Sequence, residues 1–277
     1  MRDQHLLDQF SQDGFLIVRS LLSGKEAKYH CQRLTTLRTS GTHELDHKGV
    51  DTDEEDPILR YSRMTHVQRW DRDSRELLTD PRVNRHLTLL VGRELCFVQG
   101  MVYFKPPRSR GQALHQDQFY LKVQPGIGMA VWIALERADE ENGCLHVVPG
   151  SHKLPILYKQ RADTTRSFTD VAVPVPESMD ALPLVMDAGD AVFFAGALIH
   201  GSPPNGTKDR FRRALTGHYI APTAEKVVAY YRPVLRMDGS PCGVWVDRDG
   251  ATVAEVREEG PWQPQMQGVR QDQAGGE

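Results

Sequence analysis

The N-terminal third of the chain carries apolar residues at helical spacing. They recur every three or four positions before residue 13 and again at about residues 24–37, which predicts two amphipathic helices. Between them, the apolar run at residues 15–18 is expected to be a short strand, because an Asp-Gly step breaks the helical pattern before it. A further helix is expected from about residue 74 to residue 90, where Val91 and Gly92 end it. This part of the chain therefore predicts helices that support a sheet.

Beyond residue 90 the pattern changes to short apolar runs separated by Gly, Pro and Asp. These runs cover residues 95–104, 129–135, 147–150, 184–186, 191–194 and 214–220. Short strands at this spacing, with turn residues between them, are typical of a sandwich or a barrel. The predicted fold class is therefore mainly β with flanking helices.

Length and composition favour one domain. The 277 residues are 39% hydrophobic, which is enough for a large core, and all-β barrels of this size commonly form a single unit. We expect a single domain over residues 1–260, with its core at 90–221 and its helical support at 1–90. The Gln- and Gly-rich residues 261–277 are expected to form a flexible tail.

Charge and hydropathy exclude several classes of partner. The formal net charge is -3 and long Lys/Arg runs are absent, so we expect no nucleic-acid surface and no membrane surface. No run of about eighteen apolar residues occurs, and the first residues lack the apolar stretch of a secretory signal. The predicted protein is a cytoplasmic monomer or homodimer with a small-molecule partner. Its four cysteines form no Cys-x-x-Cys pair and are expected to be buried free thiols.

One His-x-Asp triplet, His115-Gln116-Asp117, follows a predicted strand and a Pro- and Gly-containing loop. On an extended segment, side chains two residues apart point to the same face, so this imidazole and this carboxylate could bind one cation. By itself the triplet is weak evidence, because the chain has eleven histidines and a chance surface pair would look the same.

A third candidate ligand, His200, ends a turn and an apolar strand and precedes Gly201 and Ser202. This arrangement would present one imidazole at the mouth of a barrel. Two histidines and one carboxylate on one face of a metal leave three positions free, which suits Fe(II) that binds a bidentate co-substrate and dioxygen. Zinc prefers four-coordinate sites and would suit a hydrolytic or structural role.

Three arginines, Arg210, Arg212 and Arg213, lie at the entry to the last predicted strand. A guanidinium can hold a carboxylate through two parallel hydrogen bonds. Strand parity places Arg210 and Arg212 on one face together with His218, and Arg213 on the other. Strand parity therefore does not decide whether Arg210 or Arg212 would bind the carboxylate.

An ordered set of short motifs from about residue 10 to residue 221 resembles the phytanoyl-CoA dioxygenase (PhyH) family. The motifs are Phe104-Lys105-Pro106-Pro107, Leu114-His115-Gln116-Asp117, Trp132-Ile133-Ala134-Leu135, Asn142-Gly143-Cys144-Leu145, Val148-Pro149-Gly150-Ser151-His152, Gly189-Asp190, His200-Gly201-Ser202, Asn205 and Phe211-Arg212-Arg213-Ala214-Leu215. Their order, rather than any one of them, carries the resemblance. It implies a double-stranded β-helix (jelly roll, cupin-like) with helices packed on one sheet.

The resemblance also implies the site residues. Its metal triad falls on His115, Asp117 and His200, and its co-substrate arginine falls on Arg212 within the Phe-Arg-x-Ala context, with Arg210 as the alternative. The implied cofactors are Fe(II) and the co-substrate 2-oxoglutarate.

Three further residues are expected beside the co-substrate. The family match implies that Met101 and Trp132 line the 2-oxoglutarate pocket. In some members a lysine after an Ile-Thr pair contacts the co-substrate, and His66, after Met64 and Thr65, stands at the similar position here. Independently of the family, the long polar segment at residues 155–182 is expected to be a substrate-facing lid.

The implied function is that of an Fe(II)- and 2-oxoglutarate-dependent oxygenase. It would use O2 to hydroxylate, or otherwise oxidise at C–H, a small organic substrate of secondary metabolism, with release of succinate and CO2. Alternatives are desaturation, ring formation or demethylation by the same chemistry, and a non-catalytic metal-binding jelly roll that acts as a sensor. Related halogenases have a small residue in place of the carboxylate, so Asp117 disfavours halogenation.

Overall fold

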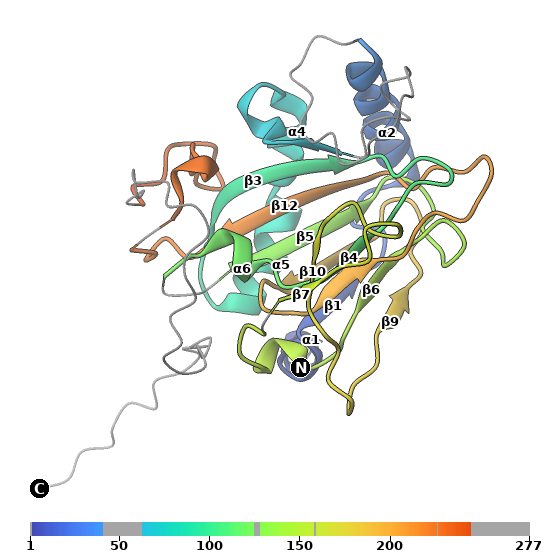
Figure 1. Cartoon of the computed structure of the whole chain (residues 1–277). Helices are drawn as coiled ribbons and strands as arrows, with labels where there is room; N and C mark the ends of the chain where they lie inside the picture. Colours follow the sequence, from blue (N-terminus) through green and yellow to red (C-terminus); the bar gives the residue numbers. More distant parts are fainter. Residues whose placement is uncertain (1, 41–62, 125–127, 158, 226, 245–277) are drawn as a thin grey trace, which may run out of the picture.

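The structure is a computed structural model that describes residues 2–40, 63–124, 128–157, 159–225 and 227–244. Two antiparallel sheets face each other, and helices cover the outer face of the larger one (Figure 1). This arrangement confirms the predicted fold class, a jelly roll with flanking helices. The predicted extent of the domain, with its core at residues 90–221, stays a prediction, and the predicted tail lies outside the described residues.

The larger sheet has six strands in the order β1-β10-β5-β12-β3-β2. The strands are β1 (Phe15–Val18), β2 (Arg63–Thr65), β3 (Cys96–Tyr103), β5 (Gly128–Ala134), β10 (Ala191–Ala195) and β12 (Ala214–Ile220). All neighbouring pairs are antiparallel. The apolar runs that predicted strands at residues 15–18, 95–104, 129–135, 191–194 and 214–220 therefore correspond to five of these six strands.

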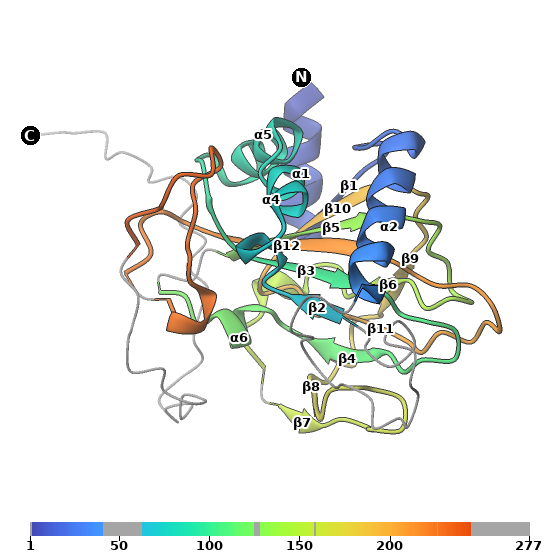
Figure 2. The same cartoon turned by 90° about the horizontal axis from the view of Figure 1, so that it is seen from above.

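The smaller sheet has four strands in the order β4-β11-β6-β9. They are β4 (Gln112–His115), β6 (Leu145–Val147), β9 (Leu182–Leu184) and β11 (His200–Ser202). A two-stranded ribbon of β7 (Gln160–Arg161) and β8 (Val171–Ala172) lies beside β4, as the turned view shows (Figure 2). This ribbon belongs to the segment that the sequence predicts to be a lid.

Helices of the described residues lie on the outer face of the larger sheet (Figure 2). They are α1 (Arg2–Asp13), α2 (Gly24–Thr39), α4 (Arg72–Leu78) and α5 (Pro81–Val91). The described residues also form one short α-helix, α6 (Gln118–Leu121), and the 3-10 helices η1 (Val67–Arg69), η2 (Ser151–Lys153) and η3 (Ala229–Tyr231).

The single helix predicted at residues 74–90 is wrong, because the segment forms two helices. Asp80 caps the second by accepting a hydrogen bond from the backbone N–H of Arg82, and Pro81 occupies its first turn. Proline has no N–H to donate to the preceding turn, so it starts a helix more readily than it continues one.

Alternate residues of the strands face two different layers. In β5, Val131 and Ile133 pack with the helices, whereas Ala130 and Trp132 pack against the smaller sheet. This alternation follows from the two-residue repeat of a strand. The space between the sheets therefore receives the even-numbered side chains of β5, and the candidate site develops there.

One disulfide joins Cys96 in β3 to Cys242. Leu235 forms a bridge with Phe97, and the turn around Gly239 then brings Pro241 back beside Leu235. The expectation of four free thiols is therefore wrong for this pair, because chain reversal brings residues 146 positions apart together. It holds for Cys31 and Cys144, which are buried and free.

Among the described residues, no helix combines the length and apolar character needed to cross a bilayer. Disulfides persist mainly in oxidising compartments. The cytoplasmic location stays a prediction.

The disulfide predicts the number of titratable thiols. Under denaturing conditions without reductant, the protein should expose two thiols to a thiol reagent, and four after reduction. Cys242→Ser should lower the free energy of unfolding by about 2–4 kcal/mol, because the open loop gains entropy in the unfolded chain. Four thiols without reductant, or an unchanged urea midpoint for the variant, would contradict the pairing.

Candidate active site

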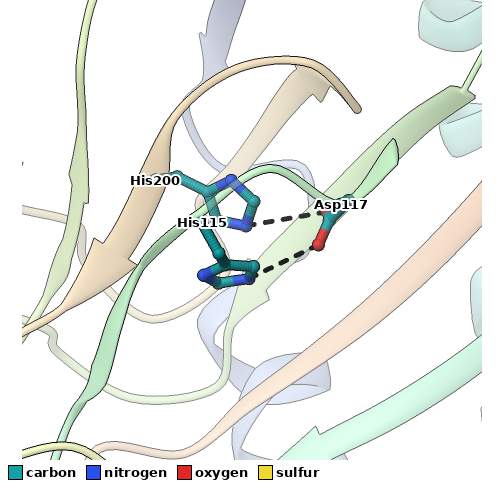
Figure 3. A group of neighbouring side chains, drawn as sticks. All are labelled: His115, Asp117 and His200. Atoms are coloured by element: carbon teal, nitrogen blue, oxygen red, sulfur yellow. Dashed lines mark ion pairs between the residues drawn. The ribbon is translucent and has the colours of Figure 1, made fainter. Parts of the chain in front are cut away.

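The centre of the site is a pair of histidines from two neighbouring strands. His115 at the end of β4 lies opposite His200 at the start of β11, with ring centroids 4.3 Å apart. Asp117 Oδ1 is 3.5 Å from His115 Nε2, and Asp117 Oδ2 is 3.6 Å from His200 Nε2 (Figure 3). One ligand atom from each of the three residues lies within 4.8 Å of the others. Ligands bound to one metal at about 2.1 Å lie about 3 Å apart at a right angle, so the cluster fits a metal with little movement.

The close approach of β11 to β4 depends on Gly201. A Cβ atom at this position would lie 2.8 Å from the carbonyl oxygen of Gln112. Any side chain would therefore push the strands apart and separate His200 from His115.

Asp117 does not lie on a strand, so the explanation of the His-x-Asp pair by strand parity is wrong. Its backbone is helical, with φ -61° and ψ -34°, and it begins α6. The turn is held by Gln116, whose buried side-chain amide donates to Ala197 O at 2.8 Å and accepts from Leu157 N at 2.9 Å. The carboxylate reaches the histidines because the chain turns immediately after β4.

Both clustered imidazoles are oriented by backbone carbonyls. His115 Nδ1 lies 2.9 Å from Ala113 O, and His200 Nδ1 lies 2.9 Å from Leu198 O. Carbonyl oxygens only accept, so each Nδ1 carries the proton and each Nε2 keeps a lone pair directed at the cluster. This is the arrangement in which histidines bind metals.

The charge states of the cluster suit a cation. Burial opposes ionisation of Asp117, but its contacts with the neighbouring histidines outweigh burial, and its pKa lies well below the usual range. Burial lowers the pKa of His200 to about 4. At neutral pH the site therefore offers one carboxylate and neutral imidazole.

His218 is a further neighbour of the cluster. It lies in β12, and its Nε2 is 3.1 Å from Asp117 Oδ2. His218 and Arg212 both line the same cavity, but the sequence carries no sign of the contact of His218 with Asp117. Its contact with Oδ2, the oxygen that also faces His200, helps to orient the carboxylate.

A narrow inner cavity extends from the cluster between the sheets. Met101, Trp132 and Arg212, all expected beside the co-substrate, line it together with the three clustered residues. Arg212 is 4% exposed and its guanidinium lies 5.3 Å from the Trp132 ring centroid. Its Nε donates to Gly143 O at 3.2 Å, whereas its Nη1 has no hydrogen-bond partner among the described residues. Burial lowers its pKa to about 10, so it remains charged at neutral pH.

The neighbouring cation, Lys105, is a useful comparison. It is also buried, but its Nζ donates to Gly143 O at 3.0 Å, to Ser202 Oγ at 2.8 Å and to Pro203 O. All three donors of the ammonium are thus used inside the protein. An unpaired buried donor is costly, so Arg212, unlike Lys105, is suited to an anion that enters the cavity.

Arg210 lies elsewhere and already has partners. It pairs with Asp139 at 2.8 Å and with Glu141 at 2.6 Å, and it does not line the inner cavity. Both arginines precede the first residue of β12, Ala214, so strand parity does not apply to them.

His66 is buried next to the site but does not line the inner cavity. Its ring nitrogens face the side-chain amides of Gln68 and Gln99, and its ring packs edge-on against Tyr230. Burial, followed by the charges of Arg69 and His218, lowers its pKa to about 3. The structure therefore places His66 behind the cavity wall, and its role at the co-substrate stays a prediction.

A wider outer cavity of about 720 Å3 opens over the cluster. It shares His115, Asp117 and Met101 with the inner cavity, and the predicted lid contributes Phe168 and Asp170 to its wall. Sequence reasoning anticipated the contribution of residues 155–182 but not that of β2 or of Tyr230 and Tyr231, which follow no motif.

Comparisons with known proteins agree with this geometry. The phytanoyl-CoA dioxygenase (PhyH) family matches residues 10–214. The peroxisomal phytanoyl-CoA dioxygenase of Rattus norvegicus is 33% identical over 148 residues, which are 50% of this chain and 43% of that protein. The chain thus aligns with less than half of the rat enzyme. A methylphosphonate hydroxylase of Gimesia maris is 29% identical over 218 residues, 78% of this chain and 79% of that protein.

Among solved structures, the epimerase SnoN in complex with Fe3+, alpha-ketoglutarate and nogalamycin RO superposes with a TM-score of 0.68. The match covers 96% of this chain and 97% of SnoN at 21% identity, and so establishes a shared fold. The jelly roll with two histidines and one carboxylate between its sheets defines the class of iron- and 2-oxoglutarate-dependent oxygenases. The chain belongs to the phytanoyl-CoA dioxygenase family of that class.

The buried, neutral His66 predicts how stability depends on pH. Between pH 6.5 and about 3 the unfolded histidine binds a proton and the folded one does not, so stability is lost as the pH falls through this window. His66→Gln removes this proton uptake. Between pH 6.5 and pH 4.5 the metal-free variant should lose less unfolding free energy than the wild type, by on the order of 2 kcal/mol, in urea titrations.

The matched control is His5→Gln, on an exposed position of α1. It should leave the pH dependence unchanged. Identical pH dependence for His66→Gln and the wild type would contradict the buried neutral state of His66.

Proposed function

We propose that this chain is an Fe(II)- and 2-oxoglutarate-dependent oxygenase that oxidises a C–H bond of a small organic substrate. The observation that carries the proposal is the position of the His115, Asp117 and His200 cluster beside a buried guanidinium with an unpaired nitrogen. A metal site and a carboxylate site are thereby within one cavity, which is what a chelating keto diacid requires. In the reaction, 2-oxoglutarate and O2 are consumed, succinate and CO2 are released, and hydroxylation adds one oxygen atom to the substrate.

In this proposal His115 Nε2, His200 Nε2 and one carboxylate oxygen of Asp117 hold the iron. Two imidazoles and one carboxylate would hold the iron and would leave coordination positions for the co-substrate and dioxygen. The bound iron supplies the oxidising chemistry. The protein supplies orientation: the carbonyls of Ala113 and Leu198 fix the imidazoles, and His218 fixes the carboxylate.

Arg212 is proposed to bind the distal carboxylate of 2-oxoglutarate. Its burial strengthens a charge-assisted hydrogen bond, and the Trp132 ring keeps the guanidinium plane in place. Met101 and Trp132 then form the apolar walls along the co-substrate.

The substrate is proposed to be a secondary metabolite. Two features support this: SnoN, the structural neighbour, is described as an enzyme of nogalamycin biosynthesis, and the outer cavity of about 720 Å3 has the size of a drug-sized ligand site. A methylphosphonate ion, with five non-hydrogen atoms, would leave most of that cavity empty. Desaturation, ring formation and demethylation remain the alternative outcomes for the bound substrate.

A sensor without turnover is the second candidate function. It would retain the metal cluster but would not need Arg212, whose unpaired nitrogen lies in the cavity. Succinate formation from 2-oxoglutarate discriminates between the two candidates.

The metal cluster is tested by turnover and by metal content. With Fe(II), 2-oxoglutarate and O2, the purified protein should form succinate even without substrate. His115→Ala, Asp117→Ala and His200→Ala should each reduce succinate formation at least about 100-fold and lower the bound iron well below one per chain, since even outer partners of metal ligands contribute about 10–100-fold. His5→Ala is the surface control. Turnover that survives in His115→Ala or Asp117→Ala would show that the cluster is misassigned.

Arg212 is tested against its neighbour Arg210. Arg212→Gln should raise the KM for 2-oxoglutarate by about 10–100-fold, because a hydrogen bond to a charged group contributes about 1.5–3 kcal/mol. Arg210→Gln removes the same charge from a residue paired with Asp139 and should change this KM less than twofold. The opposite ranking of the two variants would assign the co-substrate to Arg210.

A further inference from the structure

The outer cavity has walls that are independent of the metal cluster. They come from β2, from α6 and the residue after it, from the β7–β8 ribbon, and from the η3 region. Since the cavity opens directly over His115 and Asp117, any molecule that fills it presents its bonds to the proposed iron site.

Aromatic side chains dominate this wall. They are Tyr103, Phe119, Tyr120, Phe168, Tyr230 and Tyr231. Tyr120 and Tyr230 are 37% and 51% exposed, so both side chains are accessible to a molecule in the cavity. Rings in such a wall can pack edge-on or offset against a flat ligand. The wall therefore favours an unsaturated ring system over a flexible chain.

The charged groups of the cavity are mainly positive. Arg63, Lys122 and Lys159 line it, against Asp170 as the carboxylate besides Asp117. Among the residues that the structure describes, none of the three cations forms an ion pair. Lys159 Nζ lies 3.6 Å from the Phe119 ring centroid, and burial, followed by the charge of Lys122, lowers its pKa. A cationic substrate would meet repulsion here.

Arg63 is the cation best placed to bind a ligand. Its guanidinium lies 5.3 Å from the Phe168 ring centroid, and its Nε is buried without a hydrogen-bond partner among the described residues. It is the cross-strand partner of Tyr103, which lines both cavities. Burial raises the pKa of Tyr103, and the Arg63 charge acts in the opposite direction. A positive group and an aromatic face thus stand together at the substrate side of the metal cluster.

We propose that the substrate is an aromatic organic acid whose ring packs against Phe168 and its aromatic neighbours and whose carboxylate is bound by Arg63. Lys122 and Lys159 attract the anion to the cavity. The ring is thereby fixed at two points, and the C–H bond to be oxidised is held toward the iron site. This inference rests on the proposed function, because it assigns the substrate side of the same site.

The test uses matched probes on the anaerobic holoenzyme with Fe(II) and saturating 2-oxoglutarate, so that the Arg212 site is filled. The probes are 4-biphenylcarboxylate, its uncharged amide 4-biphenylcarboxamide, and decanoate, an acid without a ring. Isothermal titration calorimetry should show that the aromatic carboxylate binds at least tenfold more tightly than either of the others. Arg63→Gln should weaken carboxylate binding about tenfold and change amide binding less than twofold.

Two further variants separate charge from ring packing. Arg63→Lys, which keeps the charge, should retain part of the preference for the carboxylate. Phe168→Leu should weaken the carboxylate and the amide by a similar factor of about 2–10. Arg72→Gln, an equal charge change on an exposed residue of α4, is the control and should have no effect.

Equal affinity for the carboxylate and the amide, or an unchanged carboxylate Kd in Arg63→Gln, would overturn the inference. Iron-bound 2-oxoglutarate is followed separately by its visible charge-transfer absorption. If that complex forms in the wild type and in Arg63→Gln while the probes bind without discrimination, only the substrate class is wrong. If the complex does not form in the wild type, the proposed function fails and this inference fails with it.

Discussion

The site depends on one backbone pairing, that of β4 with β11. This register puts His115 opposite His200, and the carbonyls two residues before each histidine hold its Nδ1. Gly201 permits the approach, because a larger residue would meet the backbone of β4. Two strands that are far apart in the sequence thus orient the two imidazoles in the same way. The metal cluster follows from the sheet, and Asp117 joins it because the chain turns into α6 directly after β4.

Two buried basic residues near this cluster, Lys105 and Arg212, differ in whether the protein itself supplies partners for their donors. Lys105 uses all three of its donors on protein oxygens, so its hydrogen bonds are completed within the fold. Arg212 is equally buried but keeps an unpaired donor in the inner cavity. A stable protein gains nothing from an unpaired guanidinium nitrogen, since burying an unpaired donor costs free energy. In the proposed function, this donor binds the distal carboxylate of 2-oxoglutarate.

Sequence reasoning predicted what is local and periodic. The apolar runs of β5, β10 and β12 are continuous, and their strands are those expected. It failed where a single residue changes the local conformation: Asp80 and Pro81 divide one expected helix into two, and Asp117 begins a turn rather than extending a strand. It also failed for long-range contacts, as in the Cys96–Cys242 disulfide, which depends on the chain returning to β3. For the site, the order of motifs indicated the cluster and Arg212, whereas the contact of His218 with Asp117 required the three-dimensional register.

The inner and outer cavities are built from different kinds of element. This difference explains why the family likeness indicates the cofactors but not the substrate. The inner cavity takes Met101, Trp132 and Thr216 from the adjoining strands β3, β5 and β12, whose register fixes them against one another. The outer wall takes Arg63 from an edge strand and Phe168 from the connection between β7 and β8, outside both main sheets. Residues at such positions can change without disturbing the sheets. Membership of the family therefore specifies the cofactors, whereas the identity of the substrate depends on the residues that line the outer cavity.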